Sequence, residues 1–326
     1  MEREIAKFNE DYTRLRDEVG KAIVGQANVI EGVIIGLLAG GHILLEGVPG
    51  LGKTRLVHAM ADALSLVFSR IQFTPDLMPA DITGTNMIIE AEGGGKHFDF
   101  QRGPVFCNVL LADEINRATP KTQSALLEAM QEKHVTVGKK TYVLEEPFFV
   151  LATQNPLEME GTYPLPEAQL DRFLLKLHVE FPSRDELHRI MELTTKRSDD
   201  AVGKVLEKEQ ILWMRGIARD VPVAHHVQDY AIRLLEATHP AHKDAPEVSK
   251  RYLRYGASPR GAQALLLSAK IRALIDGRFN VAMDDIRYVS RGCLRHRVIL
   301  NFEAEAEGIT ADQVLDGILD SVREKA

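Results

Sequence analysis

The stretch Gly47-Val48-Pro49-Gly50-Leu51-Gly52-Lys53-Thr54 decides the fold of the first half of the chain. It matches the pattern G-x-x-x-x-G-K-[ST] in full, and it lies between a predicted strand at Ile43–Leu45 and a predicted helix at Arg55–Leu64. In this position, backbone N–H groups of the loop surround phosphate oxygens, and the helix start adds partial positive charge. We expect Lys53 to reach the β- and γ-phosphates of ATP and Thr54 to ligate Mg²⁺. The alternative is an accidental glycine-rich turn before a helix. The complete motif between a predicted strand and a predicted helix argues against it.

Two further predicted strands end in polar side chains that suit hydrolysis. Val109–Ala112 is followed by Asp113 and Glu114, and the apolar run Phe149-Val150-Leu151-Ala152-Thr153-Gln154-Asn155 ends in the amide of Asn155. An aspartate at such a strand end holds Mg²⁺ beside the loop, and the adjacent glutamate polarises the attacking water. Asn155 is predicted to orient that water. Taken alone, the acids could be helix caps and Asn155 a polar turn residue, so these roles depend on the phosphate loop upstream.

Two arginines are candidates for phosphate contacts. Arg172 lies in Leu170-Asp171-Arg172-Phe173, just before a predicted strand, and Arg260 opens a predicted helix at Ala262–Ile275. The alternative for Arg172 is a surface salt bridge with Asp171. Arg260 could be an ordinary first-turn arginine, although positive charge at a helix start opposes the helix dipole. Five other arginines cluster in the second half, and we interpret them as solvated or as subunit contacts: Arg251, Arg254, Arg291, Arg295 and Arg297.

The order of apolar patterns predicts an α/β fold with a parallel sheet, followed by a helical region. One helix is expected at Ile5–Ile23, a second begins after Gln26 and ends at Leu38, and a third begins near Thr119-Pro120. Strands are expected at Ile43–Leu45, Leu66–Ile71, Val109–Ala112, Phe148–Ala152 and Phe173–Val179. Two hairpins with glycine-containing turns are expected at Met87–Phe100, around Gly93–Gly95, and at Val135–Val143. Beyond Ser183 helical patterns dominate, so we predict domains at residues 1–182 and 205–326 with a linker at about 183–204.

Composition excludes several classes of protein. The chain has 326 residues, a formal net charge of −7 and two cysteines, Cys107 and Cys293. No overall positive field recruits nucleic acid, and two cysteines are too few for a disulfide framework. The segment Met1–Glu4 lacks the apolar core of a signal peptide, and no apolar run reaches the ~18 residues that span a bilayer. We therefore expect a cytoplasmic protein without a membrane partner.

With these motifs in order, the sequence closely resembles the MoxR family of AAA+ ATPases over nearly its whole length. The resemblance begins at Val24-Gly25-Gln26 and runs to the C-terminal helices. Its specific stretches are together far more specific than a phosphate loop alone: Glu46–Thr54, Gln101–Phe106, Asp113–Ala118, Gln123–Met130, Ala152–Pro156 and Leu165–Phe173.

The resemblance implies a P-loop AAA+ domain of three layers, followed by an all-α lid. Lys53 and Thr54 are then the Walker A residues, and Asp113 and Glu114 the Walker B pair. The two hairpins correspond to the helix-2 insert and the pre-sensor-1 hairpin, of which the Gly93–Gly95 tip is matched least well.

The same resemblance makes Asn155 sensor 1, Arg172 the arginine finger and Arg260 sensor 2. It leaves open whether Arg260 acts on its own site or on a neighbour's. Arg117 is a second candidate for a contact across the subunit interface.

The implied function is ATP hydrolysis with Mg²⁺ in a ring of identical subunits, usually six, that remodels client protein complexes or helps metal cofactors enter them. A protein with a von Willebrand factor A domain is the implied partner. The alternatives are a ring motor acting on nucleic acid, a metal-chelatase-type subunit, and a scaffold that uses ATP only to order the ring. The acidic net charge argues against a nucleic-acid motor, and intact Glu114 and Asn155 argue against the scaffold.

Overall fold

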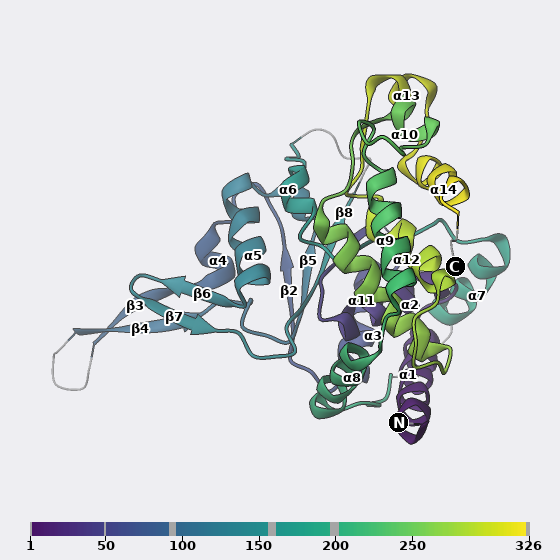
Figure 1. The fold of residues 1–326 in the computed structure, drawn as a ribbon. Coiled ribbons are helices and arrows are strands. Elements are labelled where there is room, and N and C mark those ends of the chain that lie inside the picture. The colour runs from purple at the N-terminus through teal and green to yellow at the C-terminus, as the bar shows by residue number, and fades with distance from the viewer. Residues whose placement is uncertain (1, 49, 91–95, 156–160, 196–201, 324–326) are drawn as a thin grey trace.

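The computed structural model describes residues 2–48, 50–90, 96–155, 161–195 and 202–323. Its centre is a five-stranded sheet in which every pairing is parallel, in the order β2-β5-β8-β1-β9 (Figure 1). The strands lie within two residues of the predicted limits: β1 (Ile43–Glu46), β2 (Phe68–Gln72), β5 (Val109–Asp113), β8 (Phe149–Gln154) and β9 (Leu175–His178). The predicted parallel sheet is therefore confirmed.

Alternate side chains of the strands enter two separate hydrophobic cores. Ile43 and Leu45 of β1 pack in one core, while Leu44 packs in the other, on the opposite face of the sheet. Because successive side chains of a strand point to opposite faces, both faces are covered, as three layers require. The helices of this part are α1 (Glu2–Ala22), α2 (Ala27–Ala39), α3 (Lys53–Ala63), α4 (Pro79–Thr83), the 3₁₀ turn η1 (Ile115–Arg117), α5 (Pro120–Glu132) and α6 (Glu167–Leu170).

Both predicted hairpins are present, and they are joined to each other. They are β3 (Gly84–Glu90) with β4 (Lys96–Arg102), and β6 (His134–Val137) with β7 (Lys140–Val143). The predicted Gly93–Gly95 tip lies outside the described residues. The ring of Phe100 in β4 stacks on Tyr142 in β7 with 4.1 Å between centroids, so the hairpins form one unit. This unit projects from the body of the molecule (Figure 1).

The second half of the chain is mainly helical and packs on the first half. Its helices are α7 (Arg184–Thr195), α8 (Lys208–Asp220), α9 (His225–Ala237), α10 (Glu247–Tyr252), α11 (Pro259–Ile275), α12 (Met283–Leu294), α13 (Phe302–Glu307) and α14 (Ala311–Ser321). A short antiparallel pair, β10 (Leu253–Tyr255) and β11 (Ile299–Leu300), was not predicted, because strands this short carry no periodic pattern.

Helix α11 packs against α1 and α2, and the side chains of both halves share one hydrophobic core. The limits 1–182 and 205–326 stay a prediction. Among the described residues, no helix is both long and apolar enough to cross a bilayer.

Candidate functional site

The predicted phosphate loop connects β1 to α3, and its glycines are needed for its path. Gly50 and Gly52 have φ angles of 82° and 76°, a region that favours glycine. A Cβ on Gly47 would lie 2.8 Å from the carbonyl oxygen of Val179, so no side chain fits there. The Lys53 ammonium folds back and donates a hydrogen bond to the Gly47 carbonyl at 2.6 Å. All the predicted loop residues lie in this turn except Pro49, which is outside the described residues.

The sheet register brings the predicted acids to the same edge as this loop. Gln72 pairs with Asp113, and Glu46 pairs with Gln154, so the carboxyl ends of β2, β5, β8 and β1 meet at one edge. The N–H of Gly47 donates a hydrogen bond to the carbonyl of Gln154 in β8 at 3.3 Å. Asp113, Glu114 and Asn155 therefore lie at the loop edge, as the strand ends predicted.

Thr153, which is not among the predicted site residues, contacts both of the acids predicted as the Walker B pair. Its hydroxyl donates to Asp113 Oδ1 at 2.6 Å and accepts from the Glu114 N–H at 2.8 Å. Thr153 is fully buried, so neither bond has water as a substitute. The only available signal was its position two residues before Asn155, in the strand that neighbours Asp113.

Glu114 has a left-handed backbone and two side-chain partners. Its φ and ψ are 56° and 50°, which is unfavourable for a residue with a Cβ and costs about 1–3 kcal/mol. Gln72 donates to Glu114 Oε2 at 2.8 Å, and Arg117 donates to the same oxygen at 2.9 Å. Arg117, predicted as a candidate for an interface contact, thus pairs with Glu114 of its own chain.

Asn155 follows β8 and is almost fully buried, with 4% of its surface exposed. Since β8 lies between β5 and β1, Asn155 follows the strand that separates Glu114 from the phosphate loop. Its carbonyl accepts a weak hydrogen bond from Asn116 at 3.5 Å. Asn155 thus lies at the end of the strand between the predicted acids and the phosphate loop, and its role there stays a prediction.

Arg172 and Arg260 lie together at the opposite edge of the sheet. Arg172 precedes β9, where the Leu174 N–H donates to the carbonyl of His42, the residue before β1. The four-residue strand β1, about 13 Å long at ~3.3 Å per residue, separates this edge from the phosphate loop. Arg172 and Arg260 line one cavity of about 200 Å³. Neither arginine is thus placed beside Lys53 of its own chain.

Asp171 fixes this arrangement, and it does not pair with Arg172. Arg297 Nε donates to Asp171 Oδ1 at 2.9 Å, Ser258 Oγ donates to Oδ2 at 2.8 Å, and Arg260 lies 3.7 Å away. The salt-bridge alternative for Arg172 is therefore not supported. The interpretation of Arg297 as a solvated or subunit-contact residue is wrong, because it is 7% exposed within the chain.

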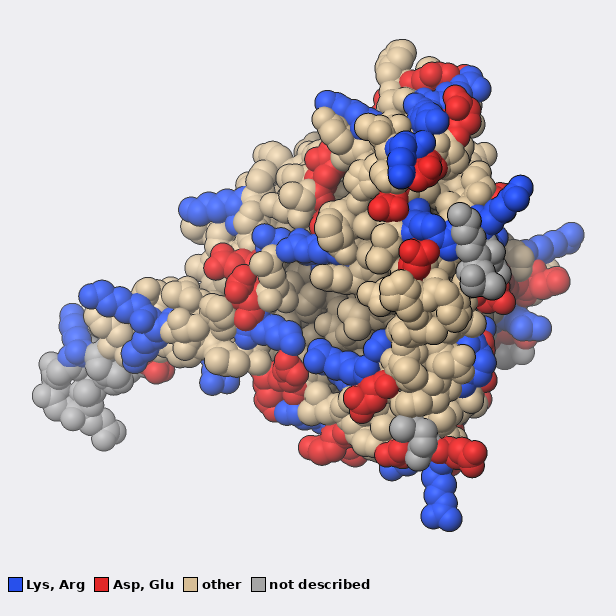
Figure 2. All heavy atoms as spheres, viewed as in Figure 1, with Lys and Arg blue, Asp and Glu red and all other residues tan. Residues whose placement is uncertain are grey.

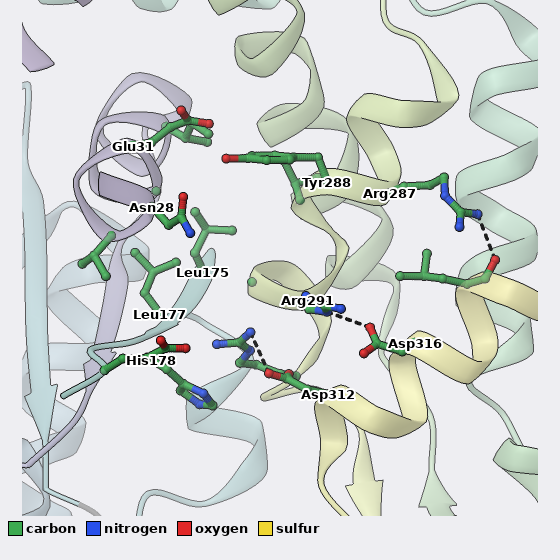
Figure 3. Close-up of a pocket in the computed structure, with 18 of the residues that line it drawn as sticks. Asn28, Glu31, Leu175, Leu177, His178, Arg287, Tyr288, Arg291, Asp312 and Asp316 are labelled. Carbon is green, nitrogen blue, oxygen red and sulfur yellow. Dashed lines mark hydrogen bonds and ion pairs between the residues drawn. The ribbon is translucent and has the colours of Figure 1, made fainter. Parts of the chain in front are cut away.

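A larger cavity of about 840 Å³ lies between α2 and β9 on one side and α12 and α14 on the other. Leu175 and Leu177 supply apolar lining, while Arg291 and Asp316 form an ion pair of 2.7 Å at its side (Figure 3). His178 at the end of β9 links this cavity to the loop edge, because its ring lies 3.1 Å from Glu46. Burial raises the pKa of Glu46, but the hydrogen bond with His178 and the charge of Lys176 outweigh this effect and lower the pKa to about 2. Glu46 therefore stays ionised beside the phosphate loop.

Two family models match this chain, and together they include almost every candidate residue. The model described as "ATPase family associated with various cellular activities (AAA)" matches residues 42–175, and the "AAA lid domain" model matches residues 246–318. The first span contains the phosphate loop, Asp113, Glu114, Asn155 and Arg172. The second contains Arg260.

Similar proteins extend the match over most of the chain. Chaperone MoxR1 of Mycobacterium tuberculosis is 44% identical over 305 residues, which is 94% of this chain and 80% of the relative. Protein MoxR of Methylorubrum extorquens is 32% identical, covering 91% of this chain and 90% of the relative. The crystal structure of a candidate ATPase from Cytophaga hutchinsonii aligns with a TM-score of 0.91 and 44% identity, covering 100% of this chain and 98% of the other.

Proposed function

The chain belongs to the MoxR family of AAA+ ATPases, and we propose that it hydrolyses ATP with Mg²⁺ in a ring of identical subunits in order to remodel client protein complexes. Nucleotide binding, ATPase activity and a chaperone-like role follow from the family. The ring, the metal and the kind of client are our proposal. The observation that carries it is the meeting of Asp113, Glu114 and Asn155 at the edge of the phosphate loop.

The residues at this edge fit Mg²⁺ held together with a nucleotide. We assign Thr54 and Asp113 as its protein ligands, because hydroxyl and carboxylate oxygens suit this ion. The described residues contain no cluster of three or more His, Cys, Asp or Glu side chains for a metal. Such a sparse set suits Mg²⁺, which is commonly held by one or two carboxylates and substrate phosphates. When bound, the ion neutralises charge on the β- and γ-phosphate oxygens.

The protein groups then divide the work of hydrolysis. Lys53 holds the β- and γ-phosphates, Asn155 orients the water, and Glu114 accepts its proton. Gln72 and Arg117 both donate to Oε2 of Glu114, so they orient the carboxylate and leave its other oxygen, Oε1, to meet the water. Thr153 keeps Asp113 and the Glu114 backbone in register throughout.

Arg172 and Arg260 are proposed to act on the ATP of the neighbouring subunit. They share one cavity at the sheet edge opposite their own phosphate loop. A head-to-tail ring brings one edge of a subunit against another edge of the next, so two guanidinium groups at this edge suit a neighbour's phosphates. Such arginines stabilise charge that develops on the transferred group. A ring of six subunits is the form we propose.

The hairpin unit is proposed to engage the client. The unit carries four exposed apolar side chains: Met87, Ile88, Phe98 and Val143. Exposed apolar groups gathered on a projection are typical of contact surfaces. We propose a client protein complex, matured with a von Willebrand factor A domain partner, and insertion of a metal cofactor as the kind of maturation.

The alternative of a nucleic-acid motor or chelatase subunit is favoured by one observation. Lys and Arg side chains gather over the hairpin unit in Figure 2, where Lys96, Arg102, Lys139 and Lys140 are exposed. A basic projection would attract phosphate backbones even on a chain of net charge −7. Stimulation of ATP hydrolysis by polynucleotide, lost at high salt, would favour this alternative over a protein client.

The central test compares the wild-type chain with Glu114→Gln, which keeps shape and removes the charge that activates water. We expect the variant to bind ATP with wild-type affinity, to accumulate assembled rings in ATP, and to release phosphate at least about 100-fold more slowly. Lys53→Ala should instead weaken ATP binding itself. Calorimetry, light scattering and phosphate release measure these properties. Wild-type turnover in Glu114→Gln would remove Glu114 from the reaction.

A further inference from the structure

Arg70 of β2 contacts the machinery at the loop edge, although it belongs to none of the motifs described above. One terminal nitrogen of Arg70, Nη2, donates to Asp113 Oδ2 at 2.7 Å and to Gln72 Oε1 at 2.8 Å. β2 pairs directly with β5, which brings Asp113 within reach, and Gln72 lies two residues further along β2 on the same face. A cation of the chain therefore sits on the carboxylate assigned to Mg²⁺.

Both oxygens of Asp113 are in use in this state. Oδ1 accepts from the Thr153 hydroxyl, and Oδ2 accepts from Arg70. The Asp113 side chain is only 12% exposed, and a carboxylate so withdrawn from water needs a charged partner. Thr153 is neutral and buried, so Arg70 is the partner that supplies the positive charge.

We propose that Arg70 holds Asp113 and competes with Mg²⁺ for its carboxylate. The proposal rests on the function proposed above. A guanidinium and the ion with its water shell cannot both approach Oδ2 closely, because their like charges repel and their atoms need the same space. Arg70 is free to leave, since 45% of its side chain is exposed to water.

The same nitrogen links the metal position to the proposed general base. Gln72 accepts from Arg70 through Oε1 and donates through Nε2 to Glu114 Oε2 at 2.8 Å. When Mg²⁺ displaces Arg70 from Asp113, the Gln72 side chain loses a constraint on its orientation. The contact between Gln72 and Glu114 would then weaken, while Arg117 would still donate to Oε2 of Glu114.

A purely structural role for Arg70 makes a different prediction. If the ion pair only stabilised the strand end, replacing Arg70 would lower stability and leave metal binding unchanged. If Arg70 oriented Asp113 for the metal, replacing it would weaken metal binding. Only competition predicts that removing the charge of Arg70 strengthens metal binding.

The test measures how much Mg²⁺ tightens the binding of a fluorescent, non-hydrolysable ATP analogue. The dissociation constant is determined in excess Mg²⁺ and in EDTA, and their ratio reports the coupling between metal and nucleotide. Arg70→Gln and Arg70→Met remove the charge, while Arg70→Lys keeps it. Arg251→Gln is the matched control, because Arg251 forms a comparable 2.6 Å ion pair with Glu303 on the helical part. Circular dichroism checks that each variant is folded.

We expect the ratio to rise about tenfold in Arg70→Gln and Arg70→Met, since a hydrogen-bonded charged competitor is lost. Arg70→Lys should stay within about threefold of wild type, and Arg251→Gln should match wild type. The affinity for the ATP analogue in EDTA should change little in all four variants. Such a result would show that the phosphate loop is intact. An unchanged or lower ratio in the folded uncharged variants would overturn the competition. Absence of analogue binding by the wild-type chain would instead overturn the proposed nucleotide function.

Discussion

Arg297 and Asp171 join the helical part of the chain to the start of β9 through an ion pair of 2.9 Å that is almost closed to water. Their side chains are 3% and 17% exposed. Arg297 also donates to the carbonyls of Phe173 and Leu174, so one guanidinium holds the backbone that carries Arg172. On its other side, Asp171 binds Ser258, the N-cap of α11, which places Arg260. The two arginines proposed to act on a neighbour are thus positioned by one buried pair.

Arg297→Met is expected to destabilise the chain by about 3–5 kcal/mol, because Asp171 loses the charge that compensates its burial. The control Arg251→Met breaks exposed ion pairs with Glu303 and Glu307 and should cost less than about 1 kcal/mol. Urea unfolding followed by circular dichroism measures both. Equal losses in the two variants would mean that the buried pair contributes no more than a surface one.

Thr153→Val keeps the volume of the side chain and removes the hydroxyl that holds Asp113 and the Glu114 N–H. We expect a stability loss of about 1–3 kcal/mol and a fall in phosphate release, because both groups lose a buried partner. Thr122→Val is the matched control: Thr122 is about equally buried and donates to the Leu77 carbonyl at 2.7 Å, and not to Asp113 or Glu114. It should lose stability and keep its rate. Slow phosphate release in both variants would trace the defect to stability alone.

Arg172→Ala is expected to bind ATP and to hydrolyse it at least about 100-fold more slowly, in line with the loss of an arginine finger. Mixing it with Lys53→Ala provides the test of action between subunits. A Lys53→Ala subunit has an intact Arg172, which can complete the intact loop of an Arg172→Ala neighbour. Phosphate release should partly recover in the mixture and depend on total protein concentration.

Arg260→Ala in place of Arg172→Ala should behave in the same way if both arginines act in trans. Mixed rings are verified by native mass measurement. If such rings form without any recovery, action in trans loses its support, unless every subunit must be active for one to turn over.

His42 makes stability depend on pH below neutrality. Burial lowers its pKa to about 4, while the hydrogen bond to the Met130 carbonyl raises it only in part. The Val150 N–H donates to Nδ1, so the neutral ring carries its proton on Nε2, toward Met130. Between the folded pKa near 4 and the unfolded value near 6.5, the unfolded chain binds more protons. Stability from this group is therefore present at neutral pH and is lost as pH falls.

The expected loss from His42 is about 2 kcal/mol between pH 7 and pH 5. Burial lowers the pKa of His296 as well, so its contribution has the same sign. Urea unfolding at both pH values, in the wild-type chain and in His42→Gln, measures the share of His42. The exposed His226→Gln serves as the control. If His42→Gln kept the full wild-type pH dependence, another group would be responsible.

The sequence by itself determined the local chemistry and much of the architecture. Gly47–Thr54 lies between a strand and a helix, and the signals for this are contiguous: an apolar run, glycines where φ is positive, then a helical pattern. Asp113, Glu114 and Asn155 were predicted at one edge because parallel strands end on the same side, whatever their order in the sheet. Their roles, and those of Arg172 and Arg260, stay predictions.

Only the tertiary structure decided which distant side chains meet. Arg70 and Thr153 reach Asp113 because β5 lies between β2 and β8, and no periodicity in one segment encodes that order. Arg297 reaches Asp171 across 126 residues because α12 packs against β9. Arg297 is charged, and it was therefore predicted to face solvent or another subunit. The packing instead buries it and makes it a partner of Asp171. Contacts of this kind depend on the packing of whole elements, whereas a motif depends on its own backbone.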